Sequence, residues 1–295
     1  MGIAAAQVKQ LRDKTGAGFM ECKSALEEAS GNIENAITIL RKKGLATAAK
    51  KAGRTAKEGA VAAHVGSDHQ VGVLFEVNCE TDFVARTDQF QELVRKVGAH
   101  IATRDPRKVR AEDPGDGEAL LTQEAGSGGG TWEQFISERI AQIGENIVVR
   151  RFSRYQGDYC EAYIHAGGRV GSLIALSGTE GMAPGDVSTL ARDLAMHVAA
   201  ADPRYVRRED VAPEDLDRER EIYRDQVAKE GKPSNIVDKI VEGKLSKFYS
   251  EVCLDDQAFI KDPNMTVAKL IASKTAAGSN VAVKGFVRYR VGEGE

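Results

Sequence analysis

The chain has 295 residues, of which 29% are charged and 42% are hydrophobic, and its formal net charge is −3. This composition is that of an ordinary soluble globular protein. It speaks against general affinity for nucleic acids, which needs a concentrated basic surface. No apolar run approaches the roughly 18 residues of a membrane span, and the N-terminal segment lacks the pattern of a signal peptide. We therefore expect a cytoplasmic protein of two or three domains, or of one domain with insertions, with no membrane attachment.

Motifs for metal binding, nucleotide binding and catalysis are missing from the sequence. The glycine-rich segments 53–59 and 125–131 lack the lysine motif of a phosphate-binding loop, so we expect no bound nucleotide. Without a nucleophile motif or a catalytic triad, the sequence predicts neither an enzyme nor a cofactor. The four cysteines form no CxxC pair, so they predict no zinc site and fit a reducing compartment: Cys22, Cys79, Cys160 and Cys253.

The first 45 residues carry apolar side chains at helical spacing in three short segments. Asn32 is a predicted cap of the third helix, and Gly44 follows its last turn. A unit of this size has a marginal hydrophobic core, which favours a docking module over a catalytic site. Residues 45–58 are small and basic, and we expect a linker that is helical in part. The three apolar stripes are Ala4, Val8 and Leu11, then Cys22, Ala25, Leu26 and Ala29, then Ile33, Ala36, Ile37 and Leu40.

Two stretches repeat the same features in order, namely a histidine, a turn, the motif VG.L, and later a helix ending in H[IV]A..DPR. A single repeat of this kind indicates one duplication and not a solenoid. Each copy is predicted to be a β-hairpin followed by a helix and a further strand. We therefore predict an α+β fold with two similar subdomains that carry antiparallel sheets, residues 53–157 and 158–292. Structural roles are favoured for the matched histidines, and the matched pairs are His64 and His165, Gly72 and Gly171, His100 and His197, and Pro106 and Pro203.

Two inserts interrupt the duplicated pattern. Residues 110–131 have the composition of a flexible loop. Residues 211–249 are predicted to form a protruding antiparallel helical hairpin, with Pro213 in its first turn and a bend at 230–233. A short helix near the end of the chain is predicted to turn three apolar residues inward: Val267, Leu270 and Ile271.

The stretch VNCETDFVART, residues 77–87, places a phenylalanine in a polar corner between a predicted strand and a predicted helix. In one interpretation Thr81, Asp82 or Asp88 caps the helix, and Phe83 packs beneath it as a hydrophobic staple. The second copy of the duplication lacks TDF although the surrounding pattern is matched, which favours a functional role. An exposed phenylalanine can act as a wedge worth roughly 1.5–3 kcal/mol when a partner buries it, and the adjacent carboxylate can compete near a bound cation.

Three other functions compete with a partner-binding wedge. An RNA- or ribosome-binding module would use the basic stretch from Arg41 to Lys57, although this stretch has no interleaved aromatic residues for base stacking. An adaptor built on the three-helix module alone would leave the duplicated core unexplained. An enzyme would need residues that the sequence does not supply.

The segments LRDKTGAGFMECKSAL (11–26) and EVNCETDFVAR (76–86) closely resemble two signature stretches of the elongation factor Ts family, and further segments agree along nearly the whole chain. The resemblance implies a guanine-nucleotide exchange factor for elongation factor Tu that binds no nucleotide itself. It also implies a ubiquitin-associated-like module over 1–52, a two-subdomain core, a coiled-coil insertion, and a C-terminal module at about 255–280. A homodimer and a two-to-two complex with the partner both stay open.

The resemblance further implies contact residues at matching positions. The ring of Phe83 would insert between two helices of the GTPase near its magnesium site, with Asp82 beside it. Glu80 stands where relatives often carry glutamine. His165 matches a further contact position, in conflict with the structural role that its repeat partner His64 favours. The implied contacts are Thr81, Asp82, Phe83 and Val84 in the turn, Leu11, Arg12, Phe19, Met20 and Lys23 in the N-terminal module, His165, and Ile260 beside Phe259 in the C-terminal module.

Overall fold

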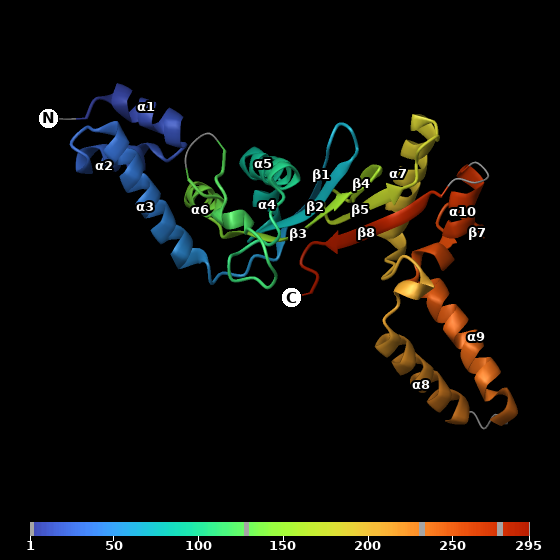
Figure 1. The fold of residues 1–295 in the computed structure, drawn as a ribbon. Coiled ribbons are helices and arrows are strands. Elements are labelled where there is room, and N and C mark those ends of the chain that lie inside the picture. Colours follow the sequence, from blue (N-terminus) through green and yellow to red (C-terminus); the bar gives the residue numbers. More distant parts are fainter. Residues whose placement is uncertain (1–2, 127–129, 230–233, 276–279, 295) are drawn as a thin grey trace.

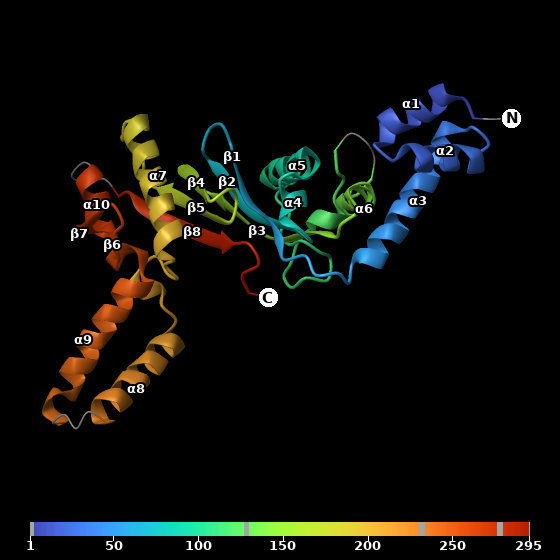
Figure 2. The same ribbon diagram turned by 180° about the vertical axis from the view of Figure 1, so that it is seen from behind.

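The computed structural model describes residues 3–126, 130–229, 234–275 and 280–294. It combines helices with small antiparallel sheets, so the α+β class predicted from the sequence is confirmed. A three-helix unit lies at one end of the molecule, two sheets with their covering helices form the middle, and a helical hairpin projects at the other end (Figures 1 and 2). None of the helices in the described ranges is long and apolar enough to cross a membrane.

The three N-terminal helices pack around a small core of their own. Asn32 caps the third helix, because its side chain accepts a hydrogen bond from the backbone N–H of Asn35 at 3.0 Å. Gly16 ends the first helix with a φ of 66°, a left-handed conformation that glycine adopts without strain. The helices are α1 (Ala5–Thr15), α2 (Phe19–Glu28) and α3 (Ile33–Lys51), and the buried core includes Val8, Leu11, Cys22, Ala25, Leu26 and Ala36.

The third helix is longer than the sequence predicted. The expectation that it ends at Gly44 is wrong, because it continues to Lys51 and takes up the first half of the basic stretch 45–58. Gly44 is buried against α6 (Trp132–Ile143), and a Cβ atom at this position would lie 3.8 Å from the Cα atom of Glu138. Packing against α6 therefore carries the helix through a residue that often terminates helices.

The first sheet has the strand order β1-β2-β3 and is antiparallel throughout. Two helices, α5 and α6, cover one of its faces and bury a core that includes Phe75, Phe90 and Ile101. The apolar residues of α5 recur every three or four positions, so they form a single buried face. The elements of this half are β1 (Glu58–Val65), β2 (Val71–Cys79), α4 (Asp82–Ala85), α5 (Asp88–Arg104), the 3₁₀ turn η1 (Leu120–Thr122), α6, and β3 (Ile147–Gln156).

The second sheet has the strand order β4-β5-β8 and is also antiparallel. Two helices, α7 and α10, cover its outer face and bury a core that includes Ile174, Leu194 and Leu270. The elements of this half are β4 (Tyr159–His165), β5 (Val170–Ser177), α7 (Pro184–Ala201), the 3₁₀ turns η2 (Arg208–Asp210) and η3 (Leu254–Asp256), β6 (Ala258–Phe259), β7 (Asp262–Thr266), α10 (Val267–Lys274) and β8 (Ala282–Arg290).

The two sheets pack against each other in the middle of the molecule. Successive side chains on a strand point to opposite faces, so Leu74 and Leu173 lie in one apolar cluster between the sheets. Their neighbours Phe75 and Ile174 point the other way, into the two helix-covered cores. The middle of the molecule is thus built of four layers, in the order helices, sheet, sheet, helices.

Two histidines at matching positions make the same contact in the two halves. His100 of α5 places Nε2 2.8 Å from Oε1 of Gln123, and His197 of α7 places Nε2 2.8 Å from Oε1 of Gln257. Each glutamine directly follows a 3₁₀ turn, η1 in the first half and η3 in the second. Both histidines therefore join a helix to the segment that returns toward the last strand of its half.

Two arginines on the last strands also match. Arg154 of β3 pairs with Asp105 at 3.5 Å, and Arg288 of β8 pairs with Asp202 at 3.3 Å. Both aspartates have a positive φ, 48° and 50°, and each forms the C-cap of the helix on its half. The matching extends from the sequence motif to the backbone conformation.

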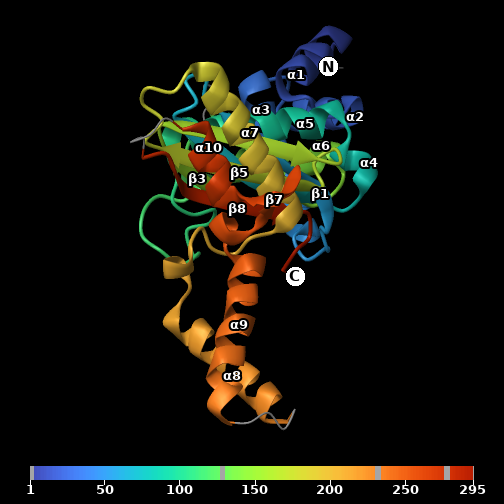
Figure 3. The same cartoon turned by 90° about the vertical axis from the view of Figure 1, so that its right-hand side faces the viewer.

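The helical hairpin projects away from the sheets (Figure 3). It consists of α8 (Pro213–Lys229) and α9 (Ser234–Val252), which pack through an apolar cluster containing Val227, Val241 and Leu245. The predicted bend at 230–233 lies outside the described residues. A second apolar cluster at the base of the hairpin joins it to the body through Val211, Phe248 and Cys253.

Candidate partner-binding site

The turn after β2 exposes the phenylalanine that the sequence singled out. Thr81 caps the short helix α4, because its hydroxyl oxygen accepts a hydrogen bond from the backbone N–H of Val84 at 3.3 Å. Phe83 follows on the first turn of α4 and is 79% exposed. The interpretation of Phe83 as a hydrophobic staple is therefore wrong. Phe90 of α5 occupies the core below instead, and Thr87 caps that helix.

A carboxylate from a distant part of the sequence holds this turn in place. Glu145 lies in the short connection between α6 and β3. Its Oε2 atom accepts hydrogen bonds from the backbone N–H groups of Glu80 and Thr81, both at 3.0 Å. Its Oε1 atom accepts a hydrogen bond from the Thr81 hydroxyl at 2.6 Å. One side chain thus satisfies three donors at the point where the strand becomes a helix.

Glu80 makes the reciprocal contact. Its Oε1 atom accepts a hydrogen bond from the backbone N–H of Asn146 at 2.7 Å, and its Oε2 atom lies 3.5 Å from Nη1 of Arg54. Asn146 in turn donates from Nδ2 to the Arg54 carbonyl at 2.9 Å. The turn is therefore tied to two other segments, the connection before β3 and the chain between α3 and β1.

The exposed face of α4 presents an aromatic ring beside a charge. Asp82 pairs with Arg86 one turn later, with Oδ2 3.0 Å from Nη2, and both side chains are partly or fully exposed. An exposed ion pair of this kind stabilises a fold by less than about 1 kcal/mol, so Asp82 can exchange Arg86 for another partner at small cost. Phe83 and Asp82 together can fill an apolar crevice and accept hydrogen bonds or compete for a cation.

The corresponding corner of the second half has no such helix. After β5 the chain passes through Gly178, which has a φ of 71° and donates its N–H to Asp158 at 2.6 Å. It then enters α7 at Pro184 without a short helix between strand and long helix. The second copy of the scaffold therefore folds without a TDF turn, so the duplicated architecture by itself does not require an exposed phenylalanine at this corner.

A second exposed apolar surface lies on the three-helix unit. Phe19 is 49% exposed and Met20 is 69% exposed, both in the first turn of α2. Arg12 is exposed on α1, and Lys23 is partly exposed and lies 3.9 Å from Glu27. Leu11 differs from the other predicted contacts of this unit, because it is fully buried in the core. The prediction that Leu11 contacts a partner directly is therefore wrong, and Leu11 instead supports the unit from its core.

The other two predicted contact residues lie in the second half. His165 is exposed at the end of β4, and its Nδ1 atom lies 3.1 Å from the hydroxyl of Tyr163. Its repeat partner His64 is only partly exposed, so the two positions differ in accessibility. Ile260 is exposed next to β6, and its backbone N–H donates to Nδ1 of His197 at 3.3 Å. Both residues belong to the second half, whereas the TDF turn belongs to the first.

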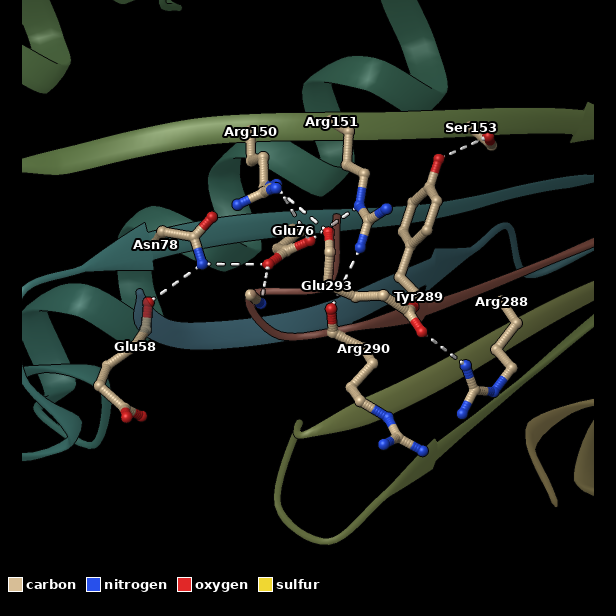
Figure 4. Close-up of polar contacts among 11 residues, drawn as sticks. Glu58, Glu76, Asn78, Arg150, Arg151, Ser153, Arg288, Tyr289, Arg290 and Glu293 are labelled. Atoms are coloured by element: carbon tan, nitrogen blue, oxygen red, sulfur yellow. Dashed lines mark hydrogen bonds and ion pairs between the residues drawn. The ribbon is translucent and has the colours of Figure 1, made fainter. Parts of the chain in front are cut away.

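Glu76, a buried carboxylate on β2, ties the segment after β8 to the first sheet (Figure 4). Glu76 is fully buried, and its Oε1 atom accepts hydrogen bonds from Asn78 Nδ2 at 3.0 Å and from the backbone N–H of Gly292 at 2.8 Å. Its Oε2 atom lies 2.8 Å from Nε of Arg151. Arg151 also stacks over the ring of Tyr289, with its guanidinium carbon 4.3 Å from the ring centre. Both halves of the core therefore meet at Glu76.

Thiol and metal chemistry find little support in the described residues. No group of three or more histidine, cysteine, aspartate or glutamate residues in that part of the chain is placed to hold a metal ion. The four cysteines are free and buried. Burial, followed by the nearby charge of Glu145, raises the pKa of Cys79 to about 12. A thiol with so high a pKa is a poor nucleophile.

Sequence reasoning found Phe83 and Asp82 but missed Glu145 and the contacts of Glu80. The segment QIGENIVVRR carried the signal in part, since a glycine followed by a glutamate precedes a predicted strand. The distance in sequence hid the contact, because Glu145 and Thr81 are 64 residues apart. Only strand pairing between β2 and β3 brings them together.

Taken together, the fold and the exposed residues define a protein with two apolar surfaces, on α2 and on α4, that suit a protein partner. Comparison with known proteins identifies its family. The family model "Elongation factor TS" matches residues 80–293. Elongation factor Ts of Aquifex aeolicus is 47% identical over 294 residues, which cover 99% of this chain and 99% of that protein. The proteins of the same name from Halothermothrix orenii and Trichlorobacter lovleyi are each 43% identical, over 303 and 300 residues, and cover 100% of this chain and 94% of theirs.

The chain therefore belongs to the elongation factor Ts family, a family of translation elongation factors. The match with the family model begins at Glu80, the residue before the Thr81 cap. The turn that exposes Phe83 thus lies inside the matched region.

Proposed function

We propose that this protein promotes the release of GDP from elongation factor Tu during translation elongation, in the cytoplasm. The exposure of Phe83 on a fixed turn is the observation that carries the proposal, because Phe83 is 79% exposed, more than any other large hydrophobic residue that the structure describes. A partner that buries such a ring gains the kind of contact that dominates interface hot spots. Membership of the elongation factor Ts family supports the identity of that partner.

The mechanism follows from physical linkage. A GTPase holds GDP through backbone amides, a lysine and a magnesium ion. In our proposal the Phe83 ring enters between two helices of the partner, and Asp82 disturbs the region of the magnesium ion. The gain from burying the ring is roughly 1.5–3 kcal/mol, and each 1.4 kcal/mol corresponds to a tenfold change in affinity. Nucleotide and exchange factor then weaken each other's binding by the same factor.

Further contacts extend the interface in this proposal. Residues 1–52 would act as a ubiquitin-associated-like module that binds the GTPase domain through Phe19, Met20, Arg12 and Lys23, with Leu11 supporting them from the core. The core subdomains would span 53–157 and 158–292. A contact by His165, and one by Ile260 from a C-terminal module at about 255–280, would complete the interface. These positions are exposed except Lys23, which is partly exposed, and Leu11, which is buried.

The competing RNA-binding function receives less support. The basic stretch from Arg41 to Lys57 is partly used inside the molecule, since Lys51 donates to the Gly144 carbonyl and Arg41 lies 3.3 Å from Glu138. Lys43 pairs with Glu28 at 2.9 Å. These contacts lower the positive charge that the stretch offers to a phosphate backbone.

The decisive experiment measures the release of fluorescently labelled GDP from purified elongation factor Tu, with and without this protein. We expect a large acceleration at substoichiometric concentrations, and no acceleration would refute the proposal. A parallel titration with RNA at two salt concentrations tests the alternative, which requires steeply salt-dependent binding. Sedimentation of the complex formed without nucleotide separates a one-to-one from a two-to-two assembly.

A further inference from the structure

We infer that Glu145 is a positioning residue for the exposed turn: its carboxylate fixes the direction of α4 and thereby the placement of Phe83. The inference rests on the proposed exchange function and adds a residue that contributes no exposed apolar contact of its own. It is carried by three hydrogen bonds that this side chain accepts, all from residues of the turn.

The first step is the geometry of the bonds. The two backbone N–H groups that donate hydrogen bonds to Glu145 belong to Glu80 and Thr81, which lie between the end of β2 and the start of α4. The Thr81 hydroxyl that donates to Glu145 also accepts from Val84, the residue after Phe83. The carboxylate therefore acts on both ends of the first turn of α4, directly at its cap and through the hydroxyl at its third residue.

The second step is that α4 is too short to fix its own direction. It spans four residues, Asp82–Ala85, which is too short for a stable helix in isolation. Ala85 is the only one of the four that is buried. Other contacts hold its C-terminal end, since Ala85 packs into the first core and its carbonyl accepts a hydrogen bond from Gln91 Nε2 at 2.7 Å. Without Glu145, the Thr81 carbonyl would still accept from Cys79 Sγ at 3.1 Å, but the N–H groups of Glu80 and Thr81 and the Thr81 hydroxyl would lose their common acceptor. The cap end of α4 would then be less restrained, and the Phe83 ring could take up more directions.

The third step is the anchor on the other side. Glu145 follows α6, and α6 packs along α3, with Arg41 paired to Glu138 and with Gln142 donating to the Thr15 carbonyl at 2.5 Å. The carboxylate thus lies two residues beyond the end of the helix that contacts the three-helix unit. A shift of α6 would carry Glu145 and the turn with it, so the two exposed apolar surfaces keep a fixed relation.

The test uses four variants, one matched control variant and two measurements. Glu145→Ala removes both acceptor oxygens and with them all three hydrogen bonds, and Glu145→Gln restores one acceptor oxygen with nearly the same shape. Phe83→Ala and the double variant complete a mutant cycle. Glu180→Ala is the matched control, because Glu180 is an exposed glutamate in the corresponding corner of the second half. The first measurement is GDP release over a range of protein concentrations, and the second is hydrogen exchange of the free protein.

We expect Glu145→Ala to lower the maximal rate of GDP release about tenfold. The complex would still form, but a Phe83 ring that points in the wrong direction would enter the partner less often and so promote nucleotide release less well. The half-saturating concentration should stay within about twofold, since the surface on α2 is unchanged, and Glu145→Gln should recover most of the rate. In the Phe83→Ala background, Glu145→Ala should change the rate by less than about twofold. Amides 82–85 should exchange faster in Glu145→Ala, and amides of α7 should not.

Two results would overturn the inference. One is an equal loss of rate from Glu145→Ala in both backgrounds, which would mean that Glu145 acts elsewhere or through general stability. The other is unchanged exchange of amides 82–85 in Glu145→Ala, which would mean that the carboxylate does not hold the turn. If the unmodified protein does not accelerate GDP release from elongation factor Tu, the proposed function fails. Hydrogen exchange still decides whether Glu145 positions α4.

Discussion

A Cβ atom on Gly72 would lie 2.5 Å from Cδ1 of Leu173, so the first sheet approaches the second more closely than any side chain at position 72 would allow. The same relationship recurs with the halves exchanged, because a Cβ atom on Gly171 would lie 3.0 Å from Cδ1 of Leu74. The two glycines that the sequence repeat matches are therefore points of close approach between the two sheets. The duplication preserved them because close-packed interiors leave no room for an added methyl group.

This contact predicts a cost for small changes. Gly72→Ala and Gly171→Ala should each lower the free energy of unfolding by about 1–3 kcal/mol, since both overpack the layer between the sheets. Gly243→Ala is the control, because a Cβ atom at position 243 meets nothing within 4 Å on α9. It should raise the stability by up to about 1 kcal/mol. Urea unfolding measures all three, and a stabilising effect of Gly72→Ala would contradict the prediction.

Phe83 and Phe90 should respond in opposite ways to the same change. Phe83→Ala removes a ring that is 79% exposed, so the free energy of unfolding should change by less than about 0.5 kcal/mol while GDP release slows. Phe90→Ala empties part of the first core and should cost about 3–5 kcal/mol. Thermal unfolding and exchange assays on both variants separate partner contact from folding. A marked loss of stability in Phe83→Ala would count against an exposed wedge.

Gly44 offers a graded test of the contact between α3 and α6. An alanine at this position makes ordinary contacts, since its Cβ atom would lie 3.8 Å from Glu138 and 3.9 Å from Ala141. Gly44→Ala should therefore raise stability by up to about 1 kcal/mol through helix propensity. Gly44→Leu should lower it by about 1–3 kcal/mol through overpacking. If both variants unfold at the same temperature, the helices do not pack as closely as the structure indicates.

The matched histidines should make stability depend on pH below neutrality. Burial lowers the pKa of both His100 and His197 from the ordinary value of 6.5, although their glutamine partners act in the opposite direction. The unfolded chain then binds protons that the folded chain does not, so stability is complete above pH 6.5 and falls as the pH drops below it. Each histidine contributes at most about 1.4 kcal/mol per pH unit to this fall in the free energy of unfolding.

The measurement is urea unfolding of the protein and of His197→Gln at several values between pH 5.5 and 7.5. The variant removes one titrating group and should show a shallower fall in stability toward pH 5.5. An unchanged slope would mean that His197 takes up its proton equally well in the folded and unfolded chains.

Glu76 should matter more for the end of the chain than for the exposed turn. Glu76→Gln keeps the size of the side chain but leaves Arg151 without its charged partner, at a cost of about 1.5–3 kcal/mol for a charge-assisted hydrogen bond. The backbone N–H of Gly292 should exchange faster in this variant, because its acceptor is weakened. Glu58→Gln, which changes a partly exposed glutamate on the neighbouring strand, provides the comparison. Equal effects of the two variants would contradict the anchoring role.

The sequence carried the local information well. Helical spacing located α1 to α3, the repeat located the matched histidines and glycines, and the asymmetry of the repeat drew attention to Phe83. These signals succeed because the period of a helix or strand, and the residue types at caps and turns, depend on neighbours within a few positions. The resemblance to a known family rested on the same short stretches.

The sequence failed where packing outweighed local preference. A glycine usually ends a helix, yet α3 passes through Gly44 because α6 lies against it. A phenylalanine after a cap can pack beneath its helix, yet Phe83 is exposed because Phe90 already fills the core. In both cases the deciding neighbour comes from an element that local periodicity does not connect to the residue.

The sequence by itself thus determined the helices, the duplication and the residues at the exposed turn. Only the tertiary structure decided how that turn is held. Glu145 and Thr81 are 64 residues apart and share no motif. The pairing of β2 with β3 places their backbones side by side, and a carboxylate between three donors then satisfies all of them. Such a contact depends on chain topology, which residue spacing does not encode.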